Sequence, residues 1–327
     1  MAKKVLVTGA SGFTGSHLCR KLVRSGYDVR ALVRRTSNVD SLKDLDLEIA
    51  YGDLADKTFP TEALDGVSVV YNIAAVYRHE VAEDQFYEVN ARGVERLLNA
   101  CLQAGVERLV HCSTVGVLGN IQNPPAAEDA PYGPGDPYQR SKLEGEKLVL
   151  AFGKQHSFPV SVVRPSAIYG PGDTRFLKLF KAIDRGRFVI LGSGEVFYHY
   201  VYIDDLVDGF MLAAEKEAAQ GEVFIIAGPE YVTINELARL IAEVLERPAP
   251  KLHLPIAPAM LAAKACQAIC KPLGIEPPLY PRRLDFFIKH RAFDISKATR
   301  VLGYEPKVDL RTGLACTANW YKLNHYL

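Results

Sequence analysis

The chain has 327 residues, of which 48% are hydrophobic and 24% are charged, as in ordinary globular proteins with a sizeable core. Its net charge of +1 and the lack of a basic run argue against nucleic-acid binding. No segment has the apolar span of a membrane helix, and the N-terminus lacks a secretion signal, so we expect a cytoplasmic protein. The six cysteines lack metal-site or redox-pair spacing, so no metal is predicted.

Short apolar runs alternate with helical patterns in the first half of the chain. Strands are predicted at residues 5–7, 29–33, 47–51, 67–73, 109–113 and 160–164. Helices are predicted at residues 17–25, 86–103 and 138–152. Strands that alternate with helices indicate an α/β fold, with a doubly wound parallel sheet covered on both faces. Continuous apolar runs are typical of strands that are buried on both sides.

The alternation becomes irregular after Pro165, where Gly, Pro and aromatic residues are frequent. We therefore predict a first domain over residues 1–165 and a smaller α/β part over residues 166–327 that mainly binds substrate. The stretch at about 201–214 is predicted to return to the first domain. An apolar helix is expected near residues 256–271, as a lid over an apolar substrate, a subunit contact or a membrane-surface contact.

Three glycines, Gly9, Gly12 and Gly15, lie between the first predicted strand and the first predicted helix. This order predicts a phosphate-binding turn rather than a loop without a ligand. The first glycine permits a tight turn, the second lets a pyrophosphate approach the backbone, and the third lets the helix pack closely on the strand. Free N–H groups at the start of the helix would then bind the phosphate.

The stretch VTGASGFTGSHL, with its GxxGxxG spacing, resembles the fingerprint of the extended short-chain dehydrogenase/reductases, within the NAD-dependent epimerase/dehydratase superfamily. Further segments match this family in order: YGD, NIAA, VNARG, HCSTVGVLG, YQRSK, RPSAIYGPGD, VYIDDLVDG and FDISKATRVLGYEP. The pattern is most similar to the 3β-hydroxysteroid dehydrogenase and dihydroflavonol reductase-like branch. The resemblance implies a Rossmann-type first domain and an NAD(P)-dependent dehydrogenase or reductase.

The same resemblance implies which residues contact the dinucleotide. Asp53 in YGD resembles the acidic residue that contacts the adenine, and Asn90 resembles a structural asparagine of the family. Cofactor contacts are expected from Gly9, Ser11, Gly12, Phe13, Thr14, Gly15, Arg34, Asp53, Leu54, Ala74, Ala75, Tyr138, Lys142 and Pro165.

Tyr138 and Lys142 lie four residues apart on a predicted helix and hence on one face. A free tyrosine has a pKa of ~10, and an adjacent ammonium lowers it by stabilising the phenolate. Tyr138 is therefore predicted to exchange a proton with the substrate oxygen while hydride moves to or from the nicotinamide. By resemblance, Lys142 also binds the nicotinamide ribose. Thr114 is expected to hold the substrate oxygen, with Ser113 as the alternative because the alignment is ambiguous by one residue.

The end of the second predicted strand bears on cofactor choice. Val33 stands where NAD enzymes of this fold carry an acidic residue, and Arg34 and Arg35 follow it. An arginine here suits the 2′-phosphate of NADP, which it can bind in bidentate fashion. We therefore predict NADP, with NAD as the alternative. The other interpretation is that both arginines cap a surface loop.

Two departures from the nucleotide-sugar branch favour an apolar substrate. Tyr198 stands where that branch has a pyrophosphate-binding arginine, and Ser166 stands where many sugar enzymes have a substrate-binding asparagine. Tyr77, Ser166 and Tyr198 are predicted to contact the substrate. His79 is interpreted as a polar lining or surface residue, because Tyr138 already fills the proton-transfer role.

The leading interpretation is an oxidoreductase that interconverts a secondary alcohol and a ketone on a sterol-like, polyketide-like or β-keto molecule. One alternative is a nucleotide-sugar epimerase or dehydratase. Another, of a different class, is a non-catalytic NADP-binding sensor or scaffold. The helices at 86–103 and 138–152 match the pair that forms the dimer interface in much of the family, so a homodimer is expected.

Overall fold

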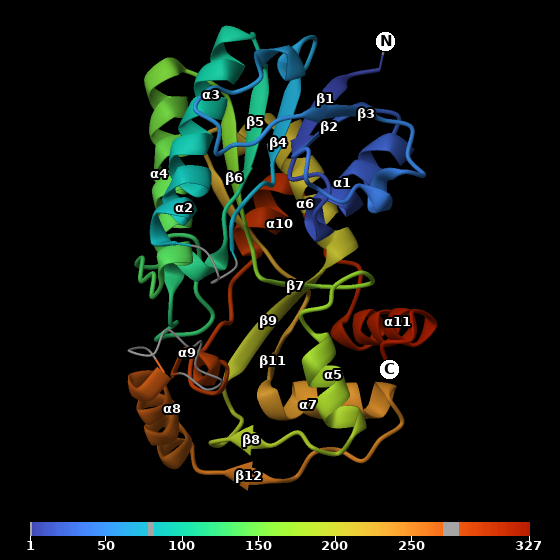
Figure 1. Ribbon diagram of the computed structural model, residues 1–327, viewed down its shortest axis with the longest axis vertical. Helices are drawn as coiled ribbons and strands as arrows, with labels where there is room; N and C mark the ends of the chain where they lie inside the picture. The colour runs from blue at the N-terminus through green and yellow to red at the C-terminus, as the bar shows by residue number, and fades with distance from the viewer. Residues whose placement is uncertain (1, 78–81, 271–280) are drawn as a thin grey trace.

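The computed structural model describes residues 2–77, 82–270 and 281–327, and Figure 1 shows an upper lobe built on a sheet above a lower lobe of short strands and helices. His79 lies outside the described residues. The strands are β1 (Lys4–Thr8), β2 (Asp28–Val33), β3 (Glu48–Tyr51), β4 (Val69–Asn72), β5 (Arg108–Cys112), β6 (Val160–Pro165), β7 (Ala167–Tyr169), β8 (Ile190–Leu191), β9 (Phe197–Tyr202), β10 (Val223–Ile226), β11 (Tyr231–Thr233) and β12 (His253–Leu254).

The α-helices are distributed over both lobes. They are α1 (Phe13–Arg24), α2 (Glu83–Tyr87), α3 (Gly93–Gln103), α4 (Pro137–His156), α5 (Leu177–Asp184), α6 (Ile203–Glu215), α7 (Ile234–Val244), α8 (Ile256–Cys270), α9 (Pro281–Leu284), α10 (Ser296–Leu302) and α11 (Leu310–Leu323). No helix within the described residues is long and apolar enough to cross a membrane.

The described strands of the upper lobe form a seven-stranded parallel sheet in the order β10-β6-β5-β4-β1-β2-β3. The six strands predicted from the apolar runs all lie in this sheet, so the predicted doubly wound Rossmann-type fold is confirmed. β3 and β4 lie on opposite sides of β1, which makes the gap between β1 and β4 the topological switch point. Ligands of open α/β sheets bind outside the carboxyl ends of the strands at such a point.

Helices cover both faces of the sheet (Figure 1). α3 and α4 lie over one face, where Val94, Leu97 and Leu98 of α3 are buried in one core cluster. α1 and α6 lie over the other face, and Leu18 and Leu22 of α1 belong to a second cluster that continues into the lower lobe. This layering leaves the carboxyl edge of the sheet facing the lower lobe, where the candidate site lies.

β10 is a strand that the sequence analysis did not identify. It pairs in parallel with β6 and completes the sheet at that edge, although its sequence comes after the alternating pattern has ended. The lower lobe carries a second sheet in the order β11-β9-β7 and the pair β12-β8. α5, α7 and α11 lie on one side of this second sheet (Figure 1).

The helix predicted over residues 86–103 is interrupted in the structure. α2 is followed by a π-helical turn at Glu88–Arg92, and α3 begins only after that turn. Asn90 lies within the turn, where its side chain accepts from Val76 N at 2.9 Å and donates to Ser141 Oγ at 2.9 Å. These bonds join the segment after β4 to α4, which a regular helical periodicity does not reveal. Such π-helical turns occur frequently at functional sites.

Candidate active site

The glycine turn is closely packed against the segment that follows β4. Gly9 has φ +66°, in the left-handed region, and a Cβ at this position would lie 2.8 Å from the backbone of Ala74. At Gly15, a Cβ would collide with the Gly9 carbonyl oxygen. The Ala74 N–H donates to the Thr8 hydroxyl at 3.1 Å, which fixes the ends of β1 and β4 side by side. Glycine is therefore required for this close approach.

α1 begins immediately after this turn, four residues earlier than its apolar periodicity predicted. Gly12 is the N-cap residue, and no side chain caps the first N–H groups of the helix. Uncapped N–H groups at a helix start, together with the dipole of the helix, suit an anionic phosphate. The turn and the start of the helix thus fit the pyrophosphate of a dinucleotide. The other residues predicted to contact the cofactor here are Ser11 in the turn and Phe13 and Thr14 at the start of α1.

The other predicted cofactor residues lie along the carboxyl edge of the sheet. Leu54 is buried just after β3, and the neighbouring Asp53 accepts from Ala55 N at 3.0 Å. Ala75 is half-buried after β4, and Pro165 is the last residue of β6.

The two arginines after β2 differ in their surroundings. Arg34 is exposed and its side chain has no hydrogen-bonding or ion-pair partner within the described residues. The guanidinium of Arg35 instead lies over the Tyr51 ring, 5.1 Å from its centroid. Arg34 is therefore the more available of the two cations.

Tyr138 and Thr114 come together in the structure. Tyr138 lies in the first turn of α4, whose N-cap Asp136 accepts from Gln139 N at 2.9 Å. Thr114 follows β5, and its side chain lies close enough to Tyr138 to act on the pKa of the phenol. Thr114 Oγ1 also accepts from Gly116 N at 3.0 Å, which fixes the side chain at the start of the next turn. A tyrosine and a threonine side chain thus lie together at the carboxyl edge of the sheet.

Lys142 is buried one helical turn after Tyr138. Its Nζ donates to the Cys112 carbonyl oxygen at the end of β5, at 2.5 Å. Burial lowers the pKa of Lys142, while the thiol of Cys112 and the carboxylate of Glu146 act in the opposite direction. The bond to Cys112 anchors α4 to the strand that precedes Thr114.

The pKa of Tyr138 differs from the sequence-based expectation. Burial is the largest influence and raises the pKa of this phenol well above its ordinary value. The charge of Arg175 and the side chain of Thr114 act in the lowering direction without offsetting the burial. The expected lowering by Lys142 is therefore wrong for this structure, because its ammonium is directed at the Cys112 carbonyl. Tyr138 is held in its protonated form, which suits a proton donor.

Ser113 lies next to Thr114 but faces a different group. Its Oγ donates to Oε2 of Glu146 at 2.6 Å, and Ser113 is buried. Arg164 of β6 donates to both oxygens of the same carboxylate, with Nε at 3.0 Å and Nη2 at 2.6 Å. Both charged residues are almost fully buried. The Ser113 hydroxyl is thus held by a buried ion pair and does not face Tyr138.

A buried polar row runs beneath the site across three strands. Thr8 Oγ1 donates to Asn72 Oδ1 at 2.8 Å, and Asn72 Nδ2 lies 3.0 Å from Nδ1 of His111. Burial, followed by the charge of Lys142, places the pKa of His111 well below its ordinary value. The neutral imidazole therefore accepts from Asn72, and the row ties the glycine-turn strand to the strand before Thr114.

Arg175 is a candidate site residue that the sequence analysis missed. Its guanidinium lies 5.6 Å from the centroid of the Phe13 ring at the start of α1. Nε donates to the buried Asp173 at 2.7 Å, and Nη2 donates to Ile168 O at 3.0 Å. Because its charge also acts on Tyr138, Arg175 joins the glycine turn to the proton-transfer residue. The residue lies two positions after the end of the GPGD match, which is the signal that pointed to this loop.

The three predicted substrate residues differ in their surroundings. Tyr77 is 52% exposed after β4. Ser166 is buried after β6, and its hydroxyl has no hydrogen-bonding partner within the described residues. Tyr198 is buried on β9, with its ring 4.8 Å from that of Phe286 and the Arg291 guanidinium 5.9 Å from its centroid. Tyr198 thus packs within an aromatic cluster of the lower lobe.

The lower lobe reaches the start of α4 through α9. Arg282 Nη2 lies 2.9 Å from Oδ2 of Asp136, the residue that caps α4. This ion pair places α9 and the residues after it beside Tyr138. A residue of the lower lobe thus contacts the residue that caps α4.

A family model described as the NAD dependent epimerase/dehydratase family matches residues 5–227. The chain belongs to this family. It is an NAD(P)-dependent enzyme of the dehydrogenase/reductase type, as the motifs predicted. Sterol demethylase protein B of Methylococcus capsulatus is 32% identical, over 97% of this chain and 98% of the relative. The 3 beta-hydroxysteroid dehydrogenase/Delta 5-->4-isomerase of Mycobacterium tuberculosis is 30% identical, over 93% of this chain and 86% of the relative.

Solved structures of the epimerase/dehydratase type share the whole architecture. The protein gox2253 superposes with a TM-score of 0.85 at 30% identity and covers 99% of both chains. The UDP-glucuronic acid 4-epimerase of Bacillus cereus, solved in complex with NAD, has a TM-score of 0.79 at 28% identity, over 98% of this chain and 99% of that chain. Both sterol-converting and sugar-converting enzymes are thus relatives of this family member.

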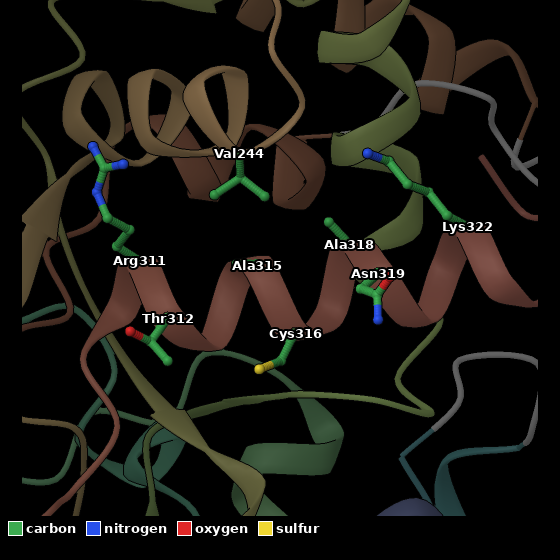
Figure 2. A pocket seen from close by; sticks show the side chains of 8 residues that line it. All are labelled: Val244, Arg311, Thr312, Ala315, Cys316, Ala318, Asn319 and Lys322. Atoms are coloured by element: carbon green, nitrogen blue, oxygen red, sulfur yellow. The ribbon is translucent and has the colours of Figure 1, made fainter.

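One hollow lies elsewhere, between α7 and α11 (Figure 2). It has a volume of about 500 Å³ and is lined by Val244, Arg311, Thr312, Ala315, Cys316, Ala318, Asn319 and Lys322. In Figure 2, Thr312 and Cys316 point away from the Val244 side of the hollow. None of the predicted site residues of the epimerase/dehydratase pattern lines this hollow.

Proposed function

We propose that this enzyme interconverts a secondary alcohol and a ketone on a largely apolar molecule. The observation that carries the proposal is the contact of Tyr138 with Thr114, with Lys142 one turn further along α4. The glycine turn after β1 opens at the same edge of the sheet. A proton-transfer group beside a dinucleotide-binding turn suits redox chemistry at a carbon–oxygen bond.

Each side chain has a separate role in this proposal. When bound, the nicotinamide supplies or accepts the hydride. Tyr138 donates its phenolic proton to the carbonyl oxygen in reduction and accepts the alcohol proton in oxidation. Thr114 orients the same oxygen through its hydroxyl. We assign Lys142 to the nicotinamide ribose, as the family resemblance implies.

We propose that NADP is the preferred nucleotide. The glycine turn, Leu54, Ala74 and Pro165 suit the parts that NAD and NADP share, so they do not discriminate. Arg34 does, because an exposed guanidinium with no partner among the described residues is available to a 2′-phosphate. The absence of a carboxylate at Val33 removes the group that would repel that phosphate.

The apolar substrate class is supported by two features. The position of Tyr198, where a sugar enzyme carries a cation, is occupied by a buried aromatic ring packed against Phe286. The named relatives that cover nearly all of the chain include a sterol demethylase protein and a hydroxysteroid dehydrogenase. Sterol-like, polyketide-like and long-chain β-keto molecules all fit this class.

A nucleotide-sugar epimerase is the second candidate, because the UDP-glucuronic acid 4-epimerase of Bacillus cereus shares 28% identity and the whole fold. A substrate panel separates the two. Hydrophobic ketones and secondary alcohols are incubated with NADPH or NADP, and UDP-sugars with NAD. Net cofactor turnover with an apolar substrate supports the first function. Conversion of a UDP-sugar without net cofactor change supports the second.

We also propose a homodimer formed through the outer faces of α3 and α4, which lie side by side in Figure 1. The family resemblance supports this arrangement. Size-exclusion chromatography with light scattering at micromolar concentration tests it. A dimer mass is expected, and a monomer mass would contradict the proposal.

A further inference from the structure

α8 is an apolar helix that is mostly exposed. Of its fifteen residues, Ile256 to Cys270, Ala263 is the one that is buried. Leu261 is 71% exposed and Ile269 is 64% exposed. A helix that contributes so little to the core does not gain its stability from packing against this chain alone.

The outward face of α8 is mostly apolar, with Lys264 and Gln267 as its exposed polar residues. Ala257, Leu261, Ala265, Ala268 and Ile269 are all exposed, and their spacing of i, i+4, i+8, i+11 and i+12 puts them on one side of the helix. A soluble surface helix normally carries polar residues on this side. Here the pattern is reversed, so the face is built to contact an apolar environment.

The apolar face extends to the residues before the helix. Leu252 is 55% exposed and Leu254 is 46% exposed, and Leu254 ends β12 just before α8 begins. Figure 1 shows β12 and α8 at the lower edge of the molecule, away from the Rossmann sheet. This set of exposed side chains, Leu252, Leu254, Leu261 and Ile269 with the alanines of α8, is called the α8 surface below.

The charge around this surface identifies its partner. Residues 248–270 contain no Asp or Glu, whereas they contain Lys251 and Lys264. Lys251 and Lys264 are exposed, and Lys264 lies at the border of the apolar face, three residues after Leu261. Basic residues beside an apolar helix face match the anionic headgroups and acyl chains of a bilayer.

We propose that the α8 surface binds an anionic lipid bilayer, with α8 lying in the plane of the interface. The helix is too short to span the bilayer, so its apolar face enters the headgroup and acyl boundary only. Lys251 and Lys264 then contact acidic headgroups. The proposal is independent of the proposed substrate, since it rests on the exposure and charge of this surface alone.

Co-sedimentation with extruded vesicles tests the proposal without substrate or nucleotide. Vesicles of phosphatidylcholine alone are compared with vesicles of phosphatidylcholine and phosphatidylglycerol. Two basic residues at the headgroups predict at least ~10-fold stronger binding to the anionic vesicles, weakened by salt. No binding to either vesicle, or equal binding to both, would overturn the proposal.

Substitutions assign the binding to α8. Leu261→Glu with Ile269→Glu is expected to reduce binding by at least about tenfold, because both side chains lose their burial in lipid. Leu323→Glu is the matched control, since Leu323 is equally exposed, at 71%, but lies on α11. Unchanged binding in the double variant would contradict the proposal.

Two further readouts of the same variants exclude other occupants of the α8 surface. If a second copy of the chain covers this face, the double variant changes the mass seen by light scattering. If the chain itself covers it, the double variant lowers the thermal unfolding temperature. The proposal requires that both quantities match those of the wild-type protein, and either change would overturn it.

Discussion

The Ser113 hydroxyl donates to Oε2 of Glu146 at 2.6 Å, and Glu146 lies one helical turn beyond Lys142 on α4. This bond and the one from Lys142 to the Cys112 carbonyl fasten α4 to the end of β5 at two successive residues. These two bonds therefore fix the position of Tyr138 on α4 relative to Thr114 after β5. The bond to Glu146 also separates the role of the Ser113 hydroxyl from that of the neighbouring Thr114 hydroxyl.

The first prediction concerns these hydroxyls. Thr114→Val should lower kcat by about 10- to 100-fold, because it removes a hydrogen bond to the reacting oxygen. Thr114→Ser should retain much of the activity, since it keeps the hydroxyl. Steady-state kinetics with an active ketone measures both. A Ser113→Ala variant that loses more kcat than Thr114→Val, at unchanged stability, would reverse the assignment.

The second prediction concerns the buried ion pair. Glu146→Gln leaves the buried Arg164 without its counter-charge, and breaking such a pair typically costs ~3–5 kcal/mol. Urea denaturation should show a loss of that order. Glu144→Gln on the same helix is the control, because Glu144 is exposed and its replacement should change stability by less than ~0.5 kcal/mol. Equal stability of both variants would refute the prediction.

The third prediction concerns cofactor choice. Arg34→Ala should weaken NADPH binding by about 10- to 100-fold, the loss expected for a hydrogen bond to a charged group. NADH binding should change little, because NADH has no 2′-phosphate. Fluorescence titration with both reduced cofactors measures the two affinities. Equal or tighter NADH binding by the wild-type protein argues against the preference for NADP.

The fourth prediction concerns pH. Burial raises the pKa of Tyr138, so its phenol remains protonated over about pH 6 to 9. Reduction needs this protonated form, and its kcat/KM should be flat in that range. Oxidation needs the phenolate, so its kcat/KM should rise about tenfold for each pH unit below the pKa. An oxidation rate that is flat with pH, with chemistry limiting, is incompatible with Tyr138 as the base.

Much of the fold follows from local patterns in the sequence. Strands buried on both faces produce apolar runs, so β1 to β6 could be identified from residues such as Val5 and Val162. β10 could not, because VFII follows an irregular stretch and becomes a strand only by pairing with β6. The π-helical turn at Asn90 could not be predicted from the sequence either, because long-range hydrogen bonds to Val76 and Ser141 stabilise it.

The site shows the same division between local and tertiary information. The spacing of Tyr138 and Lys142 predicts a shared helix face, and glycine spacing predicts the turn. The direction of the Lys142 ammonium, the pairing of Glu146 with Arg164 and the position of Arg175 depend on strands that are distant in sequence. Burial is likewise a tertiary property, which is why the sign of the Tyr138 pKa shift was mispredicted.

The central claim is that Tyr138 transfers the proton in a redox reaction on an apolar substrate. The measurement is the turnover of Tyr138→Phe with NADPH and the best hydrophobic ketone of the panel, beside Tyr231→Phe, an exposed tyrosine on β11. Because a general acid contributes ~10²–10⁴-fold, Tyr138→Phe should lose kcat by that factor at unchanged NADPH affinity, and Tyr231→Phe should match the wild type. A Tyr138→Phe enzyme with wild-type turnover would contradict the account.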